Sequence, residues 1–473
     1  MKFSEMSALQ RADQLADRGT FRPLTGRATG QTTCVVGSGL VDGIPVLLAL
    51  TDGHVRGGTL GVRESGILAG AVERVTNPKM PQQRPVALIV GFDTGGVRVE
   101  EGPTALAAAA AVGVLLARLT LTGVHLAAVI SGPRGCFGAA SVMAALPERV
   151  VMTEDAHWGL TGPKLLGGIL DGAAAEQEGL QATSAANRLA NGDTHAVVAD
   201  TAGAVRAQLM DFVAAAARGG AVPPLQARIS ASASVTATLQ SRLSGAGVGA
   251  RPVAPTRRRR DLLQYSFRGQ WRPAGPAQRR GLIHAALGTL GHRPALGLIV
   301  GPEQTRGGGI GIEEAATVVD MVRQAVAQRG PGRAVILTFL FCQGHAVDFT
   351  QERFGLHRAL AECLRVLVAA RLLGHPLVSV LGGGTYGAAY LALVAPSHRI
   401  LAMRGTSVAP MAPAVLDAFE ALRGRKAGLE TEAQLAELIP DIRMVENVIR
   451  LPHALQRELA QLLATVRPEV DAA

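Results

Sequence analysis

Short apolar runs alternate with longer helix-like segments along most of this chain. In the first half, apolar runs typical of buried strands occupy 33–37, 46–50, 86–92, 126–130 and 149–152, and helix-like segments occupy 64–75, 104–119, 137–146 and 203–218. The second half repeats the alternation, with strands expected at 296–300, 334–341, 377–381 and 399–403 and helices at 312–328, 353–373 and 387–394. This regular alternation predicts an α/β layered fold.

A glycine-rich pattern occurs once in each half. The first copy reads PVALIVGFDTGG, a helix-like run and VHLAAVISGPRGCFGAA, and the second reads VILTFLFCQG, a helix-like run and PLVSVLGGGTYGAA. Gly95 and Gly138 lie 43 residues apart, and so do Gly344 and Gly387. Glycine lets bare backbone approach a ligand, and a helix start carries unpaired N–H groups. Two such turns on adjacent strands can direct two amides at one oxygen, as in an oxyanion hole. The alternative is that each turn only connects a strand to a helix.

The character of the chain changes between residues 219 and 276, where Ala, Ser, Gly and Pro accumulate. This composition predicts a linker between a first domain at 1–218 and a second domain at 277–473. The four consecutive arginines at 257–260 are expected to form a solvated stretch or, alternatively, a contact for nucleic acid.

Composition narrows the classes of partner and cofactor. The 473 residues carry a net charge of +10, which favours an anionic partner such as nucleic acid, a phosphate-bearing thioester or an acidic carrier protein. Aromatic residues make up only 3% of the chain, which argues against single-strand binding by base stacking. The four cysteines include no CxxC pair, so neither a zinc site nor a disulfide framework is expected.

The sequence also bears on cellular location. The N-terminus, MKFSEMSALQRADQLADRG, lacks the apolar core of a secretory signal. The most apolar helix-like run, 105–117, is too short to span a bilayer and is expected to be a buried helix. We therefore expect a cytoplasmic protein.

Several stretches resemble one enzyme family. DTGGVRVEEG resembles the strand-end motif of the carboxyltransferase branch of the crotonase superfamily, and GCFGAASVMAALPERVVMTEDAHWGLTGP resembles the beta subunit of biotin-independent malonate decarboxylase. QERFGLHRALAECLRVLVAARLLGHPLVSV is similar to the gamma subunit of that enzyme, and TYGAAY resembles the carboxyltransferase C-domain turn. The resemblance covers roughly 30–215 and 295–425. It implies a beta–gamma fusion with two crotonase-type (ββα superhelix) domains in tandem, an N-type domain at 1–218 and a C-type domain at 277–473.

The resemblance also implies a reaction and its partners. A malonyl group, carried as a thioester on the phosphopantetheine-type arm of an acyl carrier protein, would lose CO₂ and become an acetyl thioester without bound metal or biotin. Backbone amides would stabilise the enolate. The expected partners are the acyl carrier protein subunit, an acyl-transferring alpha subunit and a second copy of the chain, but no nucleic acid and no membrane. The amides would form two holes, one from Gly95 or Gly96 with Gly138 or Ala139 and the other from Gly344 with Gly387 or Ala388.

The chain departs from the family pattern at three places. The gamma-type Asp-Thr-Pro-Gly-Gln stretch aligns with 341–345, where only the glycine is kept. The Val-His-Ala-Met-Gly stretch corresponds to 407–411, without the histidine, and the beta-type Gly-Pro-Glu ends in Lys164. These changes predict a degenerate second hole or a different substrate.

Two basic residues are candidate ligands for an anionic substrate or its carrier arm. Arg98 is expected to meet a substrate carboxylate or, alternatively, to pair with Glu100 or Glu101. Lys164 follows a glycine turn and is expected to neutralise a carboxylate or the arm phosphate, unless it is simply solvated.

Other polar residues have less specific interpretations. His345 is a candidate proton donor to the enolate carbon or a loop histidine without a role. Tyr386 is a candidate hydroxyl donor or a packing residue, whereas His357 and His375 are interpreted as structural. The glycine run at 307–311 lacks the Gly-Lys-Ser/Thr ending of a phosphate loop and is interpreted as a loop before a helix.

Two alternative functions stay open beside the decarboxylase. One is a biotin-dependent acyl-CoA carboxyltransferase. The other is a non-catalytic paralogue that binds a carrier protein through its basic surface.

Overall fold

The computed structural model describes two compact units. It describes residues 1–24, 32–76, 85–170, 172–247, 271–273, 283–290, 293–301, 309–328, 333–403, 405–423, 447–449 and 461. The first unit comprises Met1–Val222, Glu352–Arg358 and Pro413–Ile442, and the second comprises Pro223–Gln351, Ala359–Ala412 and Arg443–Ala473. The predicted α/β class is confirmed in both units.

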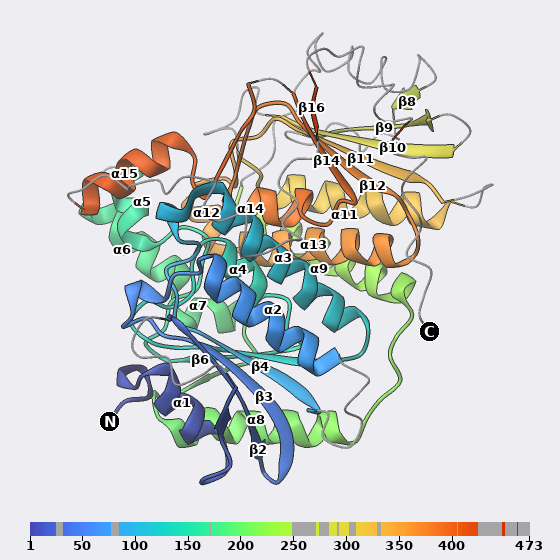
Figure 1. The fold of residues 1–473 in the computed structure, drawn as a ribbon. Coiled ribbons are helices and arrows are strands. Elements are labelled where there is room, and N and C mark those ends of the chain that lie inside the picture. Colours follow the sequence, from blue (N-terminus) through green and yellow to red (C-terminus); the bar gives the residue numbers. More distant parts are fainter. Residues whose placement is uncertain are drawn as a thin grey trace. The chain divides into compact units, whose positions relative to one another are not determined.

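A seven-stranded sheet forms the centre of the first unit (Figure 1). Its strands follow the chain order: β1 (Arg22–Pro23), β2 (Cys34–Val41), β3 (Ile44–Thr51), β4 (Ala87–Phe92), β5 (His125–Ile130), β6 (Arg149–Thr153) and β7 (Ala196–Val198). The first three strands are antiparallel, and all pairs from β3 to β7 are parallel. Because parallel strands end at the same edge, the turns after β4 and β5 are neighbours.

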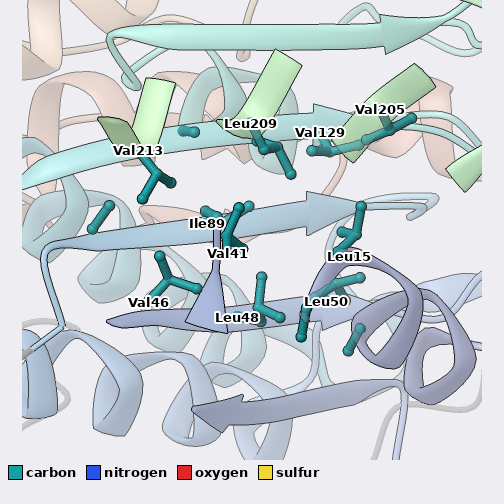
Figure 2. Packing of buried hydrophobic residues seen from close by; sticks show 14 of the residues in the cluster. Leu15, Val41, Val46, Leu48, Leu50, Ile89, Val129, Val205, Leu209 and Val213 are labelled. Atoms are coloured by element: carbon teal, nitrogen blue, oxygen red, sulfur yellow. The ribbon is translucent and has the colours of Figure 1, made fainter. Parts of the chain in front are cut away.

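Helices cover both faces of this sheet. On one face, α1 (Ala8–Leu15) and α8 (Ala202–Ala217) bury their apolar sides, and Figure 2 shows Leu15, Leu209 and Val213 packed against strand residues such as Leu48 and Ile89. On the other face lie α2 (Val62–Thr76) and α3 (Gly102–Leu121). The remaining helices of the unit are α4 (Ala139–Ala144), α5 (Pro163–Ile169), α6 (Ala173–Thr183), α7 (Ala185–Ala190) and α15 (Pro413–Arg423), with 3₁₀ turns at Phe3–Glu5, Arg56–Gly58 and Val99–Glu101.

The apolar run at 105–117 lies inside a helix that is slightly longer than the predicted 104–119. Together with the preceding turn it runs over Val99–Leu121, and within the described residues it is the one helix long and apolar enough to cross a membrane. Its most apolar window is 72% buried inside the protein, as expected for a core helix.

The second unit repeats the sheet topology of the first. Its sheet runs β8 (Trp271–Pro273), β9 (Ile283–Leu290), β10 (Arg293–Val300), β11 (Val335–Leu340), β12 (Leu377–Leu381), β14 (Arg399–Met403) and β16 (Asn447–Ile449). The first three strands are again antiparallel and the rest parallel. A separate parallel pair joins β13 (Gly384–Tyr386) to β15 (Ser407–Ala409).

The helices of the second unit include one that composition did not predict. Within the segment predicted to be a linker, α9 (Leu225–Gly245) packs against α11 (Ile312–Ala327). The arginines at 257–260 lie outside the described residues. The domain boundaries at 218 and 277 stay a prediction.

The helix predicted at 353–373 corresponds to α13 (Leu356–Leu372), and a short helix that was not predicted, α12 (Phe349–Arg353), precedes it. Gly355 between them has φ +90°, which interrupts the helix. The segment predicted as a helix at 387–394 is α14 (Gly387–Ala389) followed by one π-helical turn, Tyr390–Val394.

Candidate active site

The two glycine turns of the first unit touch through bare backbone. A Cβ atom added to Gly96 would lie 3.0 Å from the Phe137 carbonyl oxygen and 3.5 Å from the Gly138 Cα, and one added to Gly138 would lie 3.6 Å from the Gly96 Cα. Gly96 has φ +105° and Gly138 has φ +64°, values that only glycine adopts readily. The predicted meeting of these turns is therefore present in the structure.

The amides that the sequence analysis favoured are largely engaged inside the protein. Gly95 donates its N–H to the Gly57 carbonyl at 2.9 Å, and Gly96 donates to the Thr94 hydroxyl at 3.0 Å. Gly138 donates to the Leu160 carbonyl at 2.9 Å. These three N–H groups hold the turns in shape, so their assignment as oxyanion donors is revised.

Two neighbouring amides take their place as candidates. The N–H groups of Val97 and Ala139 have no acceptor among the residues that the structure describes. Val97 follows Gly96 directly, and Ala139, which the sequence analysis included, is the first residue of α4. A helix start leaves such N–H groups unpaired. The pair sits where the two turns touch, beside the solvent-exposed Gly95.

The sequence analysis did not include Val97, because the glycine pattern does not show which amides form hydrogen bonds inside the protein. Leu60 donates to the Gly96 carbonyl at 2.9 Å, and Arg98 donates to the Leu60 carbonyl at 2.9 Å. These bonds flank Val97 and leave its own N–H unused. The glycine pair marked the turn, and the amide without an acceptor belongs to the residue after it.

A buried ion pair supports the first turn. Asp93 and Arg11 are 0% and 1% exposed, and the Arg11 Nη2 lies 3.2 Å from the Asp93 Oδ2. The same carboxylate accepts N–H bonds from Gly53 at 3.1 Å and from Arg134 at 3.0 Å. Burial raises the pKa of Asp93, and the Arg11 charge opposes that rise. One aspartate thus connects three loops behind the turn.

The structure favours a structural role for Arg98. The residue is 7% exposed, and its guanidinium pairs with Glu101 at 2.5 Å and with Glu64 at 3.0 Å. It also donates to the Thr59 carbonyl at 3.0 Å. Pairing with Glu101 was the alternative left open by the sequence, and these contacts leave little of the guanidinium for a substrate carboxylate. Lys164 is exposed at the start of α5, and its role as a ligand stays a prediction.

The second unit repeats this backbone geometry with different side chains. Ile310 donates to the Gly344 carbonyl at 2.9 Å, and Ala346 donates to the Ile310 carbonyl at 2.8 Å, as Leu60 and Arg98 do in the first unit. Gly387 (φ +49°) and Ala388 open α14, and the roles of Gly344, Gly387 and Ala388 as oxyanion donors stay predictions.

The remaining candidates of the second unit lie around the same turn. Burial lowers the pKa of His345 to about 4, so its imidazole is neutral at pH 7 and is a poor source of a proton. Tyr386 is 7% exposed, and its hydroxyl lies 2.6 Å from the Ser407 hydroxyl. His375 is buried, with its Nδ1 3.0 Å from the Ala334 carbonyl. Within the described residues, no group of three or more His, Cys, Asp or Glu side chains could hold a metal ion.

Comparison with protein families identifies both halves. Residues 4–229 match the carboxyl transferase domain, and residues 305–471 match the malonate decarboxylase gamma subunit. The carboxyl transferase match confirms the predicted crotonase-type fold class.

The individual relatives have low sequence identity to this chain, and each match covers less than half of it. A malonyl-S-ACP:biotin-protein carboxyltransferase from Malonomonas rubra is 26% identical over 188 residues, covering 35% of this chain and 59% of the relative. The methylmalonyl-CoA carboxyltransferase 12S subunit of Propionibacterium freudenreichii is 31% identical over 169 residues, covering 35% of this chain and 30% of that protein. A crystal structure of a Pseudomonas malonate decarboxylase hetero-tetramer with malonate has 31% identity and a TM-score of 0.42, covering 46% of this chain and 84% of that one.

Proposed function

Because the chain belongs to the carboxyl transferase family and carries a malonate decarboxylase gamma-subunit domain in its second half, we propose that it decarboxylates a malonyl thioester. The malonyl group is carried on an acyl carrier protein. Its carboxylate leaves as CO₂, the electron pair of the broken bond moves onto the thioester as an enolate, and protonation at carbon gives the acetyl thioester.

The observation that carries this proposal is the pair of unused amides at the contact between two glycine turns. The N–H groups of Val97 and Ala139 have no acceptor in the described structure, and both belong to backbone held by internal bonds. Preorganised amides of this kind stabilise the negative charge that develops on a thioester oxygen. Burial around the turns strengthens such bonds because it lowers the local dielectric constant.

Cofactor and partners follow from the same proposal. No group is bound directly, and the phosphopantetheine-type arm of the carrier protein delivers the substrate. The partners are the carrier protein subunit, an acyl-transferring alpha subunit and a second copy of this chain. The protein acts in the cytoplasm.

Ala139→Pro tests the proposal because proline removes one N–H without removing a side chain. Proline is tolerated at the first position of a helix, where the N–H has no intrahelical partner. We expect kcat for CO₂ release from malonyl-carrier protein to fall by about 10²–10³-fold. Ala202→Pro, at the first position of α8, is the matched control and should keep wild-type turnover. Full activity of Ala139→Pro would remove Ala139 from the site.

A second candidate function is transfer of the carboxyl group to a biotinyl carrier. It is favoured by the Malonomonas relative, whose name specifies that acceptor. Both reactions pass through the same enolate, so the amides do not separate them. Following the label of a carboxyl-¹⁴C malonyl thioester does, because the decarboxylase releases it as ¹⁴CO₂ and the transferase places it on biotin. Label that appears on the biotinyl carrier protein, and no longer does when avidin is added, would select the transferase.

A further inference from the structure

Glu352 is a buried carboxylate that no part of the proposed reaction uses. It lies in the second half of the sequence, at the end of α12, but belongs to the first compact unit. Its side chain is 0% exposed. The two carboxylate oxygens accept separate backbone bonds, from the Leu160 N–H at 3.0 Å and from the Thr161 N–H at 2.7 Å.

The backbone that Glu352 holds leads directly to the glycine turn. The carbonyl of Leu160 accepts the Gly138 N–H at 2.9 Å. One residue earlier, Gly159 donates to the Cys136 carbonyl at 3.1 Å. The segment at 159–161 therefore lies between the carboxylate and the turn, bonded to both, and Ala139 is the next amide along.

The fit around the carboxylate is close. A Cβ atom added to Gly159 would lie 2.9 Å from the Glu352 Oε2. Arg188, 0% exposed, donates to the Trp158 carbonyl at 2.8 Å and pairs with Asp193 at 3.1 Å. The carboxylate is thus buried against the segment that it binds, and its two bonds hold that segment in place.

Several ionisable groups surround this carboxylate. Burial raises the pKa of Glu352, and the Arg188 charge and the Leu160 and Thr161 donors oppose the rise. The His357 ring packs against the Trp158 ring in a tilted arrangement, with 4.3 Å between ring centroids, and burial lowers the pKa of this histidine well below its usual range. Arg353 is turned to Glu178 at 3.3 Å.

We propose that Glu352 is a positioning residue for the oxyanion site. Its carboxylate fixes the backbone of Leu160 and Thr161, which in turn holds the Gly138 amide and leaves the Ala139 N–H as the donor for substrate. The structural part of this inference is independent of the reaction, and its catalytic consequence rests on the proposed function.

Glu352→Gln tests the structural part by hydrogen–deuterium exchange. Glutamine keeps one acceptor oxygen but places an NH₂ group against the other backbone N–H, so one of the two bonds is lost. We expect faster exchange in peptides covering 157–161 and 132–141, with the exchange of β2 and β3 unchanged. Glu178→Gln, which touches the adjacent Arg353, is the control and should leave both peptides unchanged. Unchanged exchange in Glu352→Gln overturns the proposal.

Steady-state kinetics of Glu352→Gln test whether the position of the 159–161 segment affects the rate of decarboxylation. We expect kcat of Glu352→Gln to fall by about tenfold or more, with KM within about twofold of wild type. Protonating Glu352 turns one acceptor oxygen into a donor, so wild-type kcat should fall on the acid side through the raised pKa of this group. That limb should be missing in the glutamine variant. Loss of folded protein alone would not alter the pH profile of the remaining enzyme.

The outcomes separate the two proposals. Wild-type protein without malonyl decarboxylation contradicts the proposed function, and the exchange experiment still decides the structural role of Glu352. Faster exchange with unchanged kcat and an unchanged acid limb overturns the positioning role. If Glu352→Gln does not fold, Glu352→Asp replaces it, because the shorter side chain keeps the charge but reaches the two amides less well, and the same results are expected in smaller measure.

Discussion

At the residue scale, the two glycine turns differ in what fills the space behind them. In the first unit, a Cβ atom on Gly132 would lie 2.2 Å from the Asp93 Cγ. In the second unit, a Cβ atom on Gly382 would lie 2.0 Å from the Phe341 Cε1. A side chain at either glycine would collide with the residue that follows the neighbouring strand, so both positions require glycine. A hydrogen-bonding carboxylate fills the first position and an aromatic ring fills the second.

The buried pair of Asp93 with Arg11 should be costly to break. Asp93→Asn leaves the Arg11 charge buried without its partner, and we expect a loss of about 3–5 kcal/mol in the free energy of unfolding. Urea unfolding measures it. Glu178→Gln breaks a half-exposed pair in the same unit and should cost less than about 1 kcal/mol. Similar losses in the two variants would contradict the supporting role of Asp93.

His345 should make stability depend on pH. Its pKa is lowered from 6.5 to about 4 in the folded protein, so between these values the unfolded chain binds more protons. Stability is therefore complete above pH 6.5 and is lost as pH falls, by about 2 kcal/mol at pH 5. His345→Gln should lose that part of the decline. Unfolding curves of both proteins at pH 7 and pH 5 provide the measurement, and equal slopes would show that His345 titrates normally.

At the element scale, periodicity was enough to predict the strands and helices that carry the site. The strands predicted at 86–92 and 126–130 are β4 and β5, and the helix predicted at 104–119 is α3. Local pattern suffices here because each segment is bounded by glycine or polar residues. The break between α12 and α13 was missed because Gly355 sits inside a continuous helical pattern, and a single glycine does not reveal its φ of +90°.

Gly355→Ala tests that break. At φ +90° an L-residue is strained, and the added Cβ would lie 3.1 Å from the Asp193 Oδ1. We expect a loss of about 1–3 kcal/mol in the free energy of unfolding of the first unit. Gly203→Ala in α8 meets nothing within 4 Å and should be neutral or slightly stabilising. An unaffected Gly355→Ala protein would mean that one continuous helix forms at no cost.

The sequence predicted where the candidate site lies, but not which backbone amides are available there. The paired glycine turns were visible because they repeat at one spacing. The acceptors that use up the amides of Gly95 and Gly138 are the carbonyls of Gly57 and Leu160, which are distant in sequence. Arg11 and Glu352 act across still longer separations, so no local pattern marks them. Only the folded backbone distinguishes a used amide from a free one.

At the scale of the whole molecule, the two units share the same pattern of hydrogen bonds at the start of one helix each. At the start of a helix in each unit, the Gly61 N–H donates to the Glu64 carboxylate at 3.2 Å and the Gly311 N–H donates to the Glu314 carboxylate at 2.8 Å. The next amide in each unit donates across to a later side chain, Glu101 in the first and Gln351 in the second. The position of Arg98 is taken by Ala346. The first unit therefore has a charged network behind its turn, whereas the equivalent position of the second unit is uncharged.

This asymmetry predicts that the first turn carries the reaction, and one matched pair of variants decides it. Gly96→Ala and Gly344→Ala introduce the same strain, because φ is +105° and +108° at these positions. The new Cβ presses on the Phe137 carbonyl at 3.0 Å in the first turn but makes an ordinary 3.6 Å contact with Tyr386 in the second. We therefore expect kcat for malonyl decarboxylation to fall by about tenfold or more in Gly96→Ala and by less than about twofold in Gly344→Ala. Thermal unfolding of both variants controls for the shared strain. A larger loss of kcat in Gly344→Ala would place the reacting thioester at the second turn, and the neutral side chains there would then be an adaptation to its substrate.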